Sequence, residues 1–266
     1  MLAQITALTY LTPLREGGSL PGIIEADDLG TYVVKFTAAG QGPKALVAEI
    51  IVGELARRLG IRTPELKLIM VDPEMGRRDP DEEVNDLLTK SAGINLAVDF
   101  LPGSIGYERL MSVRARVAAP IVWLDALVAN VDRSARNTNL LLWGGDLWAI
   151  DHGASLRFHH AWGRPEAFAT SAYRYDDHVL ARSGSVRSVH DQLAARATAA
   201  VLDEVTALVP DAWLLPDETR PDPNAPADAQ RPGSRTGTIC WLDSKPRRRG
   251  CRDAVPVRHP AGCPPG

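Results

Sequence analysis

The sequence predicts an α+β protein with a small β-rich N-terminal lobe and a helical C-terminal lobe. Short β-branched runs separated by turn residues occupy the first part of the chain. A strongly apolar helical pattern interrupts these runs at residues 42–60, and further helical patterns follow at 117–129 and 188–209. With 266 residues, the chain is long enough to bury a core in two lobes.

The strands of the first lobe are predicted from alternating or β-branched apolar runs. They are expected within ITALTYL (5–11), IIEAD (23–27), TYVVKF (31–36), ELKLIMVD (65–72) and AGINLAVDFLPG (92–103). DLG separates the second run from the third and predicts a hairpin, and a Gly- and Ser-containing loop follows the first run at 14–22. GRRDPDEEVND (76–86) is expected to be a polar connection.

The helices are predicted from apolar residues at helical spacing. In the helix at 42–60 two arginines fall in the last turn, and Gly60 is a suitable C-terminal stop because glycine adopts positive φ without strain. The helix at 117–129 has Pro120 near its start. Residues 188–209 carry an apolar residue about every three to four positions, which indicates helical structure.

The stretch from Asn130 to Gly153 combines a hairpin with oxygen-bearing side chains. Two apolar runs, NLLLW and LWAID, are separated by GGD, which predicts a hairpin with its turn near Gly144–Gly145. The start of the first strand then lies beside the end of the second. This geometry brings Asn137 close to Asp151, with Asp132 a short loop away.

This set of side chains suits phosphoryl transfer. Asp132 could orient or deprotonate an acceptor hydroxyl, while Asn137 and Asp151 could hold Mg²⁺ against the terminal phosphates. Gly153 would let the chain turn sharply after the metal ligand. The alternative is an ordinary hairpin with polar residues at its ends.

Lys35 and Glu49 form a second candidate pair. Lys35 lies in a predicted strand and Glu49 in the apolar face of the next helix, an arrangement that orients an ammonium group toward nucleotide phosphates in kinase folds. Alternatively, Lys35 lies on a solvated edge strand and Glu49 shares a solvent face with Glu54. The backbone of the loop REGGSLPG could wrap phosphates, although the loop matches neither G-x-G-x-x-G nor Walker A, and a plain surface loop is the alternative.

Taken in order, VVKF, AEIIVGELARRLGIRTPEL, NVDRSARNTNLL and AIDHGASL resemble the HipA-like kinases, which are relatives in fold of the phosphatidylinositol 3- and 4-kinases. The resemblance extends over residues 5–215. It implies a bilobal protein-kinase-like or PI-kinase-like domain at 1–216, with an N-lobe over 1–97 and a C-lobe over 98–216. It also implies that ATP and Mg²⁺ are the cofactors.

The resemblance assigns roles by position. Lys35 would contact the nucleotide phosphates with support from Glu49, Asp132 would be the catalytic aspartate, and Asn137 and Asp151 would be Mg²⁺ ligands. The remaining nucleotide contacts would come from a phosphate-covering loop and an interlobe segment whose backbone meets the adenine: Gly17, Gly18 and Ser19, and Val98, Asp99 and Phe100. Where these kinases usually have a histidine two residues after the catalytic aspartate, this chain has Ser134.

The leading functional hypothesis is a kinase that transfers the ATP γ-phosphoryl group to a hydroxyl, with a protein Ser or Thr as acceptor by analogy with the family. One alternative is a lipid or small-molecule acceptor. The other is a catalytically silent nucleotide-binding or protein-interaction module. Residues 231–266 carry eight basic and two acidic residues, which is a net charge of +6. Since the whole chain has a net charge of −3, residues 1–230 have a net charge of −9. This acidic body makes nucleic acid an unlikely partner and counts against phosphoinositides.

Residues 217–266 are expected to be a disordered Pro- and Arg-rich tail, because they show neither helical nor strand periodicity. No apolar run approaches the roughly 18 residues that a membrane span needs. The N-terminus lacks the charged start and cleavage site of a signal peptide, so a cytoplasmic protein is expected.

Overall fold

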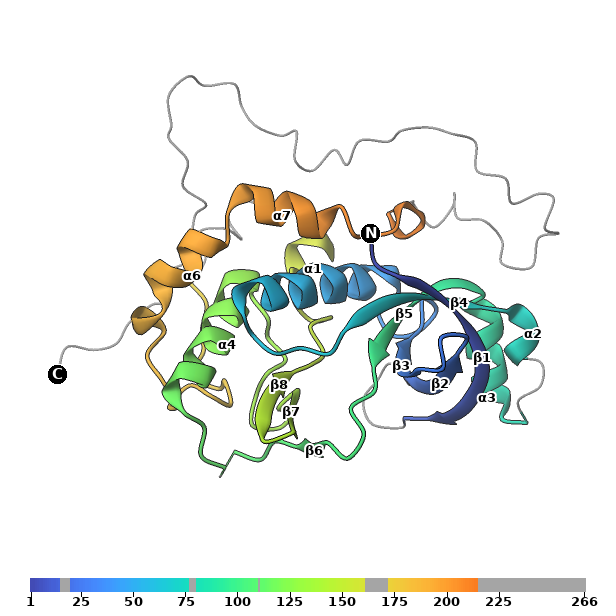
Figure 1. Ribbon diagram of the computed structural model, residues 1–266, viewed down its shortest axis with the longest axis horizontal. Helices are drawn as coiled ribbons and strands as arrows, with labels where there is room; N and C mark the ends of the chain where they lie inside the picture. The colour runs from blue at the N-terminus through green and yellow to red at the C-terminus, as the bar shows by residue number, and fades with distance from the viewer. Residues whose placement is uncertain (15–19, 77–79, 110, 161–171, 215–266) are drawn as a thin grey trace, which may run out of the picture.

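The computed structural model describes residues 1–14, 20–76, 80–109, 111–160 and 172–214. The predicted phosphate-covering residues Gly17, Gly18 and Ser19 and the tail at 217–266 therefore lie outside the described residues. The described part is a mixed α+β structure in which a β-rich portion and a helical portion lie side by side (Figure 1).

The N-terminal strands close into a five-stranded barrel in the order β1-β2-β3-β5-β4. The strands are β1 (Gln4–Pro13), β2 (Gly22–Ala26), β3 (Thr31–Lys35), β4 (Leu66–Val71) and β5 (Gly93–Asp99). The parallel pairing of β1 with β4 closes the barrel, and Ile24, Val34 and Ile69 pack in its core. The predicted strands are thus present, but the prediction of a small sheet-rich lobe did not include closure into a barrel.

Helix α1 (Pro43–Leu59) is buried on nearly all sides because both portions of the molecule pack against it (Figure 1). Its N-terminal half packs with strand residues of the barrel and with Trp213, and its C-terminal half packs with α4 (Ala115–Val128). As predicted, Gly60 ends α1 with φ of 83°, and its N–H bonds to the carbonyl groups of Ala56 and Arg57.

The prediction of a polar connection at 76–86 is wrong in part, because α3 (Glu82–Lys90) begins within this stretch. Asp81 caps this helix by accepting a hydrogen bond from the Glu83 N–H. Val84 and Leu88 pack into the barrel core, so the tertiary contact stabilises a helix whose sequence is mostly polar. A short helix, α2 (Pro73–Gly76), precedes it.

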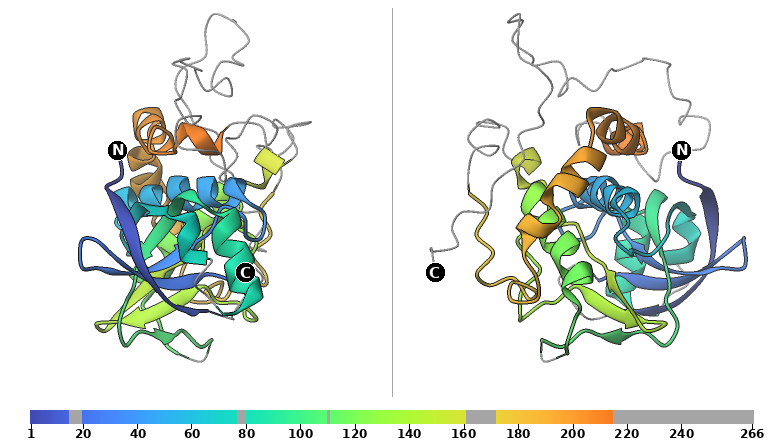
Figure 2. Two further views of the ribbon diagram at one scale, coloured as in Figure 1. Left: turned by 90° about the vertical axis from the view of Figure 1, so that its right-hand side faces the viewer. Right: turned by 60° about the vertical axis from the view of Figure 1, so that its left-hand side comes forward.

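The C-terminal portion contains a three-stranded sheet and several short helices. The predicted hairpin is formed by β7 (Leu140–Trp143) and β8 (Asp146–Ala149), and β6 (Ile105–Gly106) adds an unpredicted edge strand. The helical stretch expected at 188–209 divides into separate helices, which Figure 2 shows running along α1. Short turns and helices complete this portion: η1 (Arg157–His160), η2 (Val186–Ser188), α6 (His190–Arg196), α7 (Ala199–Thr206) and η3 (Asp211–Trp213).

The division between α6 and α7 has a local cause. Thr198 accepts a hydrogen bond from the Val201 N–H and so caps a new helix. None of the helices in the described part of the chain combines the length and the apolar character needed to cross a bilayer.

Trp213 ties the end of the described chain to the barrel, and its loss is expected to destabilise the fold. The side chain is 5% exposed, and its Nε1 donates to the Ile94 carbonyl at 3.1 Å. We expect Trp213→Ala to lower the free energy of unfolding by about 3–5 kcal/mol. Trp213→Phe keeps most of the packing and should cost clearly less in the same urea titration. Equal losses in the two variants would contradict the packing argument.

Candidate active site

Lys35 is held between two carboxylates from distant parts of the chain. Its Nζ donates to Glu49 Oε1 of α1 and, at 2.9 Å, to Asp151 Oδ1, two residues after β8. The Lys35 and Glu49 side chains are 16% and 4% exposed, whereas that of Asp151 is 41% exposed. One ammonium therefore joins the barrel, α1 and the end of the hairpin.

Glu49 is paired on both of its oxygens. Besides Lys35, its carboxylate accepts the backbone N–H groups of His152 at 3.0 Å and Gly153 at 2.8 Å. These donors compensate for the burial of a carboxylate in an apolar helix. Glu49 thus does not share a solvent face with Glu54, which pairs with Arg57 and Arg58 about one turn further along α1.

The close approach of Gly153 to Glu49 also explains the glycine at this position. A Cβ on residue 153 would lie 3.1 Å from Glu49 Oε1, which is tighter than an ordinary contact. Because glycine has no Cβ, the chain at residue 153 can lie close enough to α1 for the N–H groups of His152 and Gly153 to donate to Glu49. Asp151 itself has φ of 52°, an uncommon left-handed backbone conformation for a residue other than glycine.

Burial and the neighbouring charges shift the pKa values of Glu49, Asp151 and Lys35 in different directions. Burial raises the pKa of Glu49 to about 7, although Lys35 opposes this shift. Burial also acts to raise the pKa of Asp151, but the Lys35 ammonium outweighs it and lowers that pKa below its usual range. Burial likewise acts to lower the pKa of Lys35, and the carboxylates of Glu49 and Asp151 raise it instead. Asp151 is therefore the carboxylate that stays ionised and partly open to solvent.

Asp132 and Asn137 lie together on the loop before β7. Asn137 Nδ2 donates to Asp132 Oδ2 at 2.9 Å. Asn139, which the sequence analysis did not single out, donates to the Asp132 carbonyl at 2.6 Å and to Oδ2 at 3.3 Å. The two amides orient the Asp132 carboxylate and leave it partly exposed.

Ser134 builds the turn that carries Asn137. Its N–H donates to the Asn137 carbonyl at 2.8 Å, and its Oγ accepts from the N–H groups of Arg136 and Asn137. Serine hydroxyls commonly organise such turns. Ser134, at the position where the HipA-like kinases usually have a histidine, therefore has a structural function in this loop.

Arg133 connects this loop to the end of the hairpin, and the sequence analysis missed it. The side chain is fully buried, and its Nε donates to Asp125 Oδ2 of α4 at 2.6 Å. Its Nη1 donates to the carbonyl groups of Asn139 and Ile150. Because Ile150 precedes Asp151, one guanidinium holds both the Asp132 loop and the Asp151 turn.

Asp125 is the buried acceptor at the centre of this network. It also accepts from Asn130 Nδ2 at 3.0 Å and from His178 Nε2 at 2.9 Å. Burial acts to raise the pKa of Asp125, but Arg133 and His178 lower it below the usual range, so the carboxylate stays ionised. A carboxylate in the apolar pattern IVWLDALV was the one signal in the sequence that could have revealed this network.

Two histidines complete the network, and each faces a donor through its Nδ1. The Leu180 N–H donates to His178 Nδ1 at 3.0 Å, which leaves the ring hydrogen on Nε2 for Asp125. His152 Nδ1 faces Arg133 Nη2 at 3.3 Å and must act as an acceptor. Burial, with a further contribution from the Arg133 charge, lowers the pKa of His152 to about 3.

The chemistry of Asn137 and Asp151 fits a divalent cation. Asn137 uses its amide nitrogen on Asp132, which leaves its amide oxygen as an acceptor, and the Asp151 carboxylate is partly exposed. Within the described ranges no three His, Cys, Asp or Glu side chains converge as a metal cluster. A Mg²⁺ ion held by this pair would take its other oxygen ligands from phosphate and water, as Mg²⁺ does at nucleotide sites.

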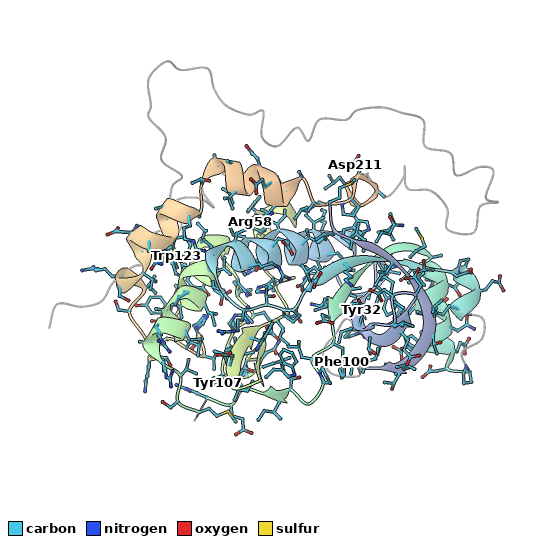
Figure 3. The ribbon with its side chains drawn as sticks, in the orientation of Figure 1. Tyr32, Arg58, Phe100, Tyr107, Trp123 and Asp211 are labelled. Carbon is cyan, nitrogen blue, oxygen red and sulfur yellow. The ribbon has the colours of Figure 1, made fainter. Side chains whose placement is uncertain are left out.

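The predicted adenine-contacting segment lies at the junction of the two portions, where Figure 3 labels Phe100. The Asp99 N–H donates to the Glu65 carbonyl at 2.9 Å, and the Phe100 N–H donates to the Thr31 carbonyl at 3.1 Å. Val98 pairs with Val33 and Leu66 inside the barrel. The N–H groups of Asp99 and Phe100 are therefore engaged by the barrel in this arrangement.

Replacement of Glu49 by glutamine tests the cluster around Lys35. A glutamine amide has one oxygen that accepts hydrogen bonds, and its NH₂ group replaces the second oxygen of the carboxylate. At least one of the buried donors that bond to Glu49 therefore loses its partner. We expect Glu49→Gln to lower the free energy of unfolding by about 1–3 kcal/mol in a urea titration. Glu54→Gln, one and a half turns further along α1, is the matched control and should cost less, because its arginine partners are partly exposed. A larger loss in the control would contradict the assignment.

The HipA-like kinase family matches residues 9–230, and no curated protein matches the chain. The Golgi casein kinase is 14% identical over 78% of this chain and 66% of its own, with a TM-score of 0.45. The same kinase with Mn/ADP bound has a TM-score of 0.48 at 14% identity, covering 79% of this chain and 66% of that chain.

A third solved structure, the Helicobacter pylori proinflammatory kinase CtkA, is 14% identical over 57% of this chain and 60% of its own, with a TM-score of 0.35. The chain thus spans slightly less than two thirds of the length of each of these structures. The family match covers most of the chain, and within it lie all the residues of the Lys35 cluster and the Asp132 loop. This chain is a member of the HipA-like kinase family.

Proposed function

We propose that this kinase transfers the γ-phosphoryl group of ATP, in the presence of Mg²⁺, to a hydroxyl group, and that the acceptor is a Ser or Thr of a protein. One observation carries the proposal: Lys35 is fixed by Glu49 and Asp151 from two other elements. Such a fixed ammonium beside an ionised carboxylate is what a phosphoryl-transfer site requires.

In this proposal, the role of each residue follows from its charge. The Lys35 ammonium contacts the nucleotide phosphates, and Glu49 keeps it in place as the phosphates approach. Asn137 and Asp151 would hold Mg²⁺, which would neutralise the negative charge of the phosphates. Phosphoryl transfer depends mainly on such positioning and on electrostatic stabilisation of the phosphate charge.

Asp132 acts on the acceptor. Its carboxylate, oriented by Asn137 and Asn139, accepts a hydrogen bond from the acceptor hydroxyl and takes its proton as the hydroxyl oxygen attacks phosphorus. The bond between phosphorus and the β–γ bridging oxygen breaks, and ADP leaves with that oxygen.

A catalytically silent module is the second candidate, and the lipid or small-molecule acceptor is the third. The presence in one chain of all four of the residues proposed for catalysis, Lys35, Asp132, Asn137 and Asp151, favours catalysis over the silent module. The net charge of −9 over residues 1–230 favours a protein acceptor over an anionic lipid surface.

Calorimetry of ATP binding, with and without Mg²⁺, tests the nucleotide site. The wild type should bind more tightly with Mg²⁺, and Asp151→Ala should lose that increase, because a charged metal ligand is removed. Glu25→Ala, on the barrel away from Lys35, is a matched loss of an exposed carboxylate and should keep the increase. A folded wild type that binds no ATP under either condition would contradict the proposal.

The acceptor class needs a separate experiment. Transfer of γ-labelled phosphate to arrays of Ser-, Thr- and Tyr-containing peptides, and to vesicles with phosphatidylinositol, compares the candidates directly. We expect label on Ser or Thr peptides in the wild type and none in Asp132→Ala. Label on lipid alone would replace the acceptor part of the proposal, and the nucleotide part would stand.

A further inference from the structure

A cavity of about 600 Å³ lies at the turn end of the β7–β8 hairpin, the end opposite Asp132 and Asp151. It is open to solvent on one side and is lined by residues 60–62 after α1, residues 112–114, the first two turns of α4, Leu142 and residues 145–147. None of the residues proposed for phosphoryl transfer lines it. Its volume is within the range typical of small-molecule sites.

Three arginines line this cavity, and two of them make it cationic. Arg62 pairs with Asp146, at 3.0 Å between Nη2 and Oδ2, so this cation is neutralised within the cavity wall. Arg114 and Arg116 have no ion pair with any described residue, and both are exposed. Guanidinium groups bind carboxylates and phosphates in a two-pronged geometry.

The position of the arginines adds a second electrostatic contribution. Arg114 is the N-cap residue of α4, a helix of 14 residues, and no side chain caps its first turn. The positive end of the helix dipole therefore acts in the same direction as Arg114 and Arg116. These features favour a negatively charged group at the α4 end of the cavity.

Part of the cavity wall is apolar. Val117 and Leu142 are partly exposed and contribute apolar side chains to it, whereas Ile121 and Leu147 lie behind them and are almost fully buried. A bare inorganic anion would leave this wall in contact with water. An apolar group attached to the anion would cover it and gain free energy from the burial.

We infer that this cavity binds an organic anion, in which a phosphate or carboxylate group is carried on an apolar body. The anionic group pairs with Arg114 and Arg116, and the body packs on the wall formed by α4 and the hairpin. The site is separate from the nucleotide site, and the inference does not depend on the proposed function.

Phenyl phosphate is a suitable probe, and the amide spectrum of the full chain locates where it binds. We expect the N–H signals of Arg116 and Leu142 to shift on titration. Inorganic phosphate should bind at least about threefold more weakly because it lacks the apolar ring. Phenol, which lacks the charge, should cause no shift at these residues.

The double variant Arg114→Gln/Arg116→Gln should bind phenyl phosphate at least about tenfold more weakly, since it loses charge-assisted hydrogen bonds. Both residues are exposed, so the fold should survive, which a thermal melt verifies. Lys90→Gln removes an exposed cation from α3 and should leave the affinity unchanged.

Three results would overturn the inference. One is equal affinity of the wild type and the double variant for phenyl phosphate. Another is a set of shifts confined to the segments around Lys35 and Asp151, which would place the probe in the nucleotide site. The third is equal binding of phenyl phosphate and inorganic phosphate, which would show that the apolar wall plays no part.

Discussion

Replacement of Asp132 by alanine is expected to lower the rate of phosphoryl transfer by about 10²–10⁴-fold, the usual contribution of a general base. The physical reason is that no other carboxylate of the described residues occupies the loop beside Asn137. Nucleotide affinity should change little, because Asp132 makes no hydrogen bond to Lys35, Glu49 or Asp151. A single-turnover assay with γ-labelled ATP measures the transfer, and calorimetry measures the binding.

Asp132→Asn is the matched variant. Its amide oxygen can still accept from Asn137 and Asn139, so the loop should keep its shape, but it cannot take a proton. Both variants should therefore lose transfer, whereas only Asp132→Ala should disturb the two asparagines. Unchanged transfer in Asp132→Asn would show that this residue only positions the acceptor. Loss of nucleotide binding in both variants would contradict the separation of the two roles.

The part of the site that could be predicted depends on short sequence separations. Lys35 and Glu49 are 14 residues apart on a strand and the following helix, and a single connection between them limits their possible positions. The Gly144–Gly145 turn likewise fixes the register of the hairpin that connects the Asp132 loop to Asp151. The local pattern was enough to predict the Lys35–Glu49 contact and the hairpin, whereas the pairing of Asn137 with Asp151 and the catalytic roles remain predictions.

The features that could not be predicted depend on distant partners. The β1–β4 pairing joins Gln4 to Leu68, and no local pattern specifies which strand closes a barrel. Arg133 stands next to Asp132 in a polar loop, where a long cationic side chain is normally expected to be solvated. Its partner Asp125 and the further partner His178 come from a helix and from a later segment. Only the tertiary structure shows that they meet.

Loss of the Arg133 side chain is expected to have the largest effect on stability. Arg133→Met would leave the ionised Asp125 carboxylate without its cation and would remove the guanidinium hydrogen bonds to the carbonyl groups of Asn139 and Ile150, although the Asn139 carbonyl would keep the Ile150 N–H. Breaking a buried ion pair by removing one partner usually costs about 3–5 kcal/mol. We expect a loss of this size in the free energy of unfolding measured with urea.

A double variant separates the ion pair from the packing. Asp125→Asn/Arg133→Met removes the uncompensated charge, so its cost should be smaller than the sum of the two single costs. Strict additivity would show that Asp125 and Arg133 contribute independently, which would contradict the network. Arg174→Met, at an exposed ion pair with a nitrogen–oxygen distance of 3.7 Å, is the matched surface control and should cost little.

Arg133→Lys shows whether the network also supports the proposed Mg²⁺ site. Lysine keeps the positive charge beside Asp125, but a single ammonium cannot reproduce the fork that reaches Asn139 and Ile150. Asn139 bonds to Asp132, and Ile150 precedes Asp151, so this substitution loosens the two sides of the site relative to each other. We expect the Mg²⁺-dependent part of the ATP affinity to fall while the Mg²⁺-independent part is kept, because Lys35 and Glu49 make no hydrogen bond to Arg133. An equal fall in both parts would show instead that Arg133 supports the fold as a whole.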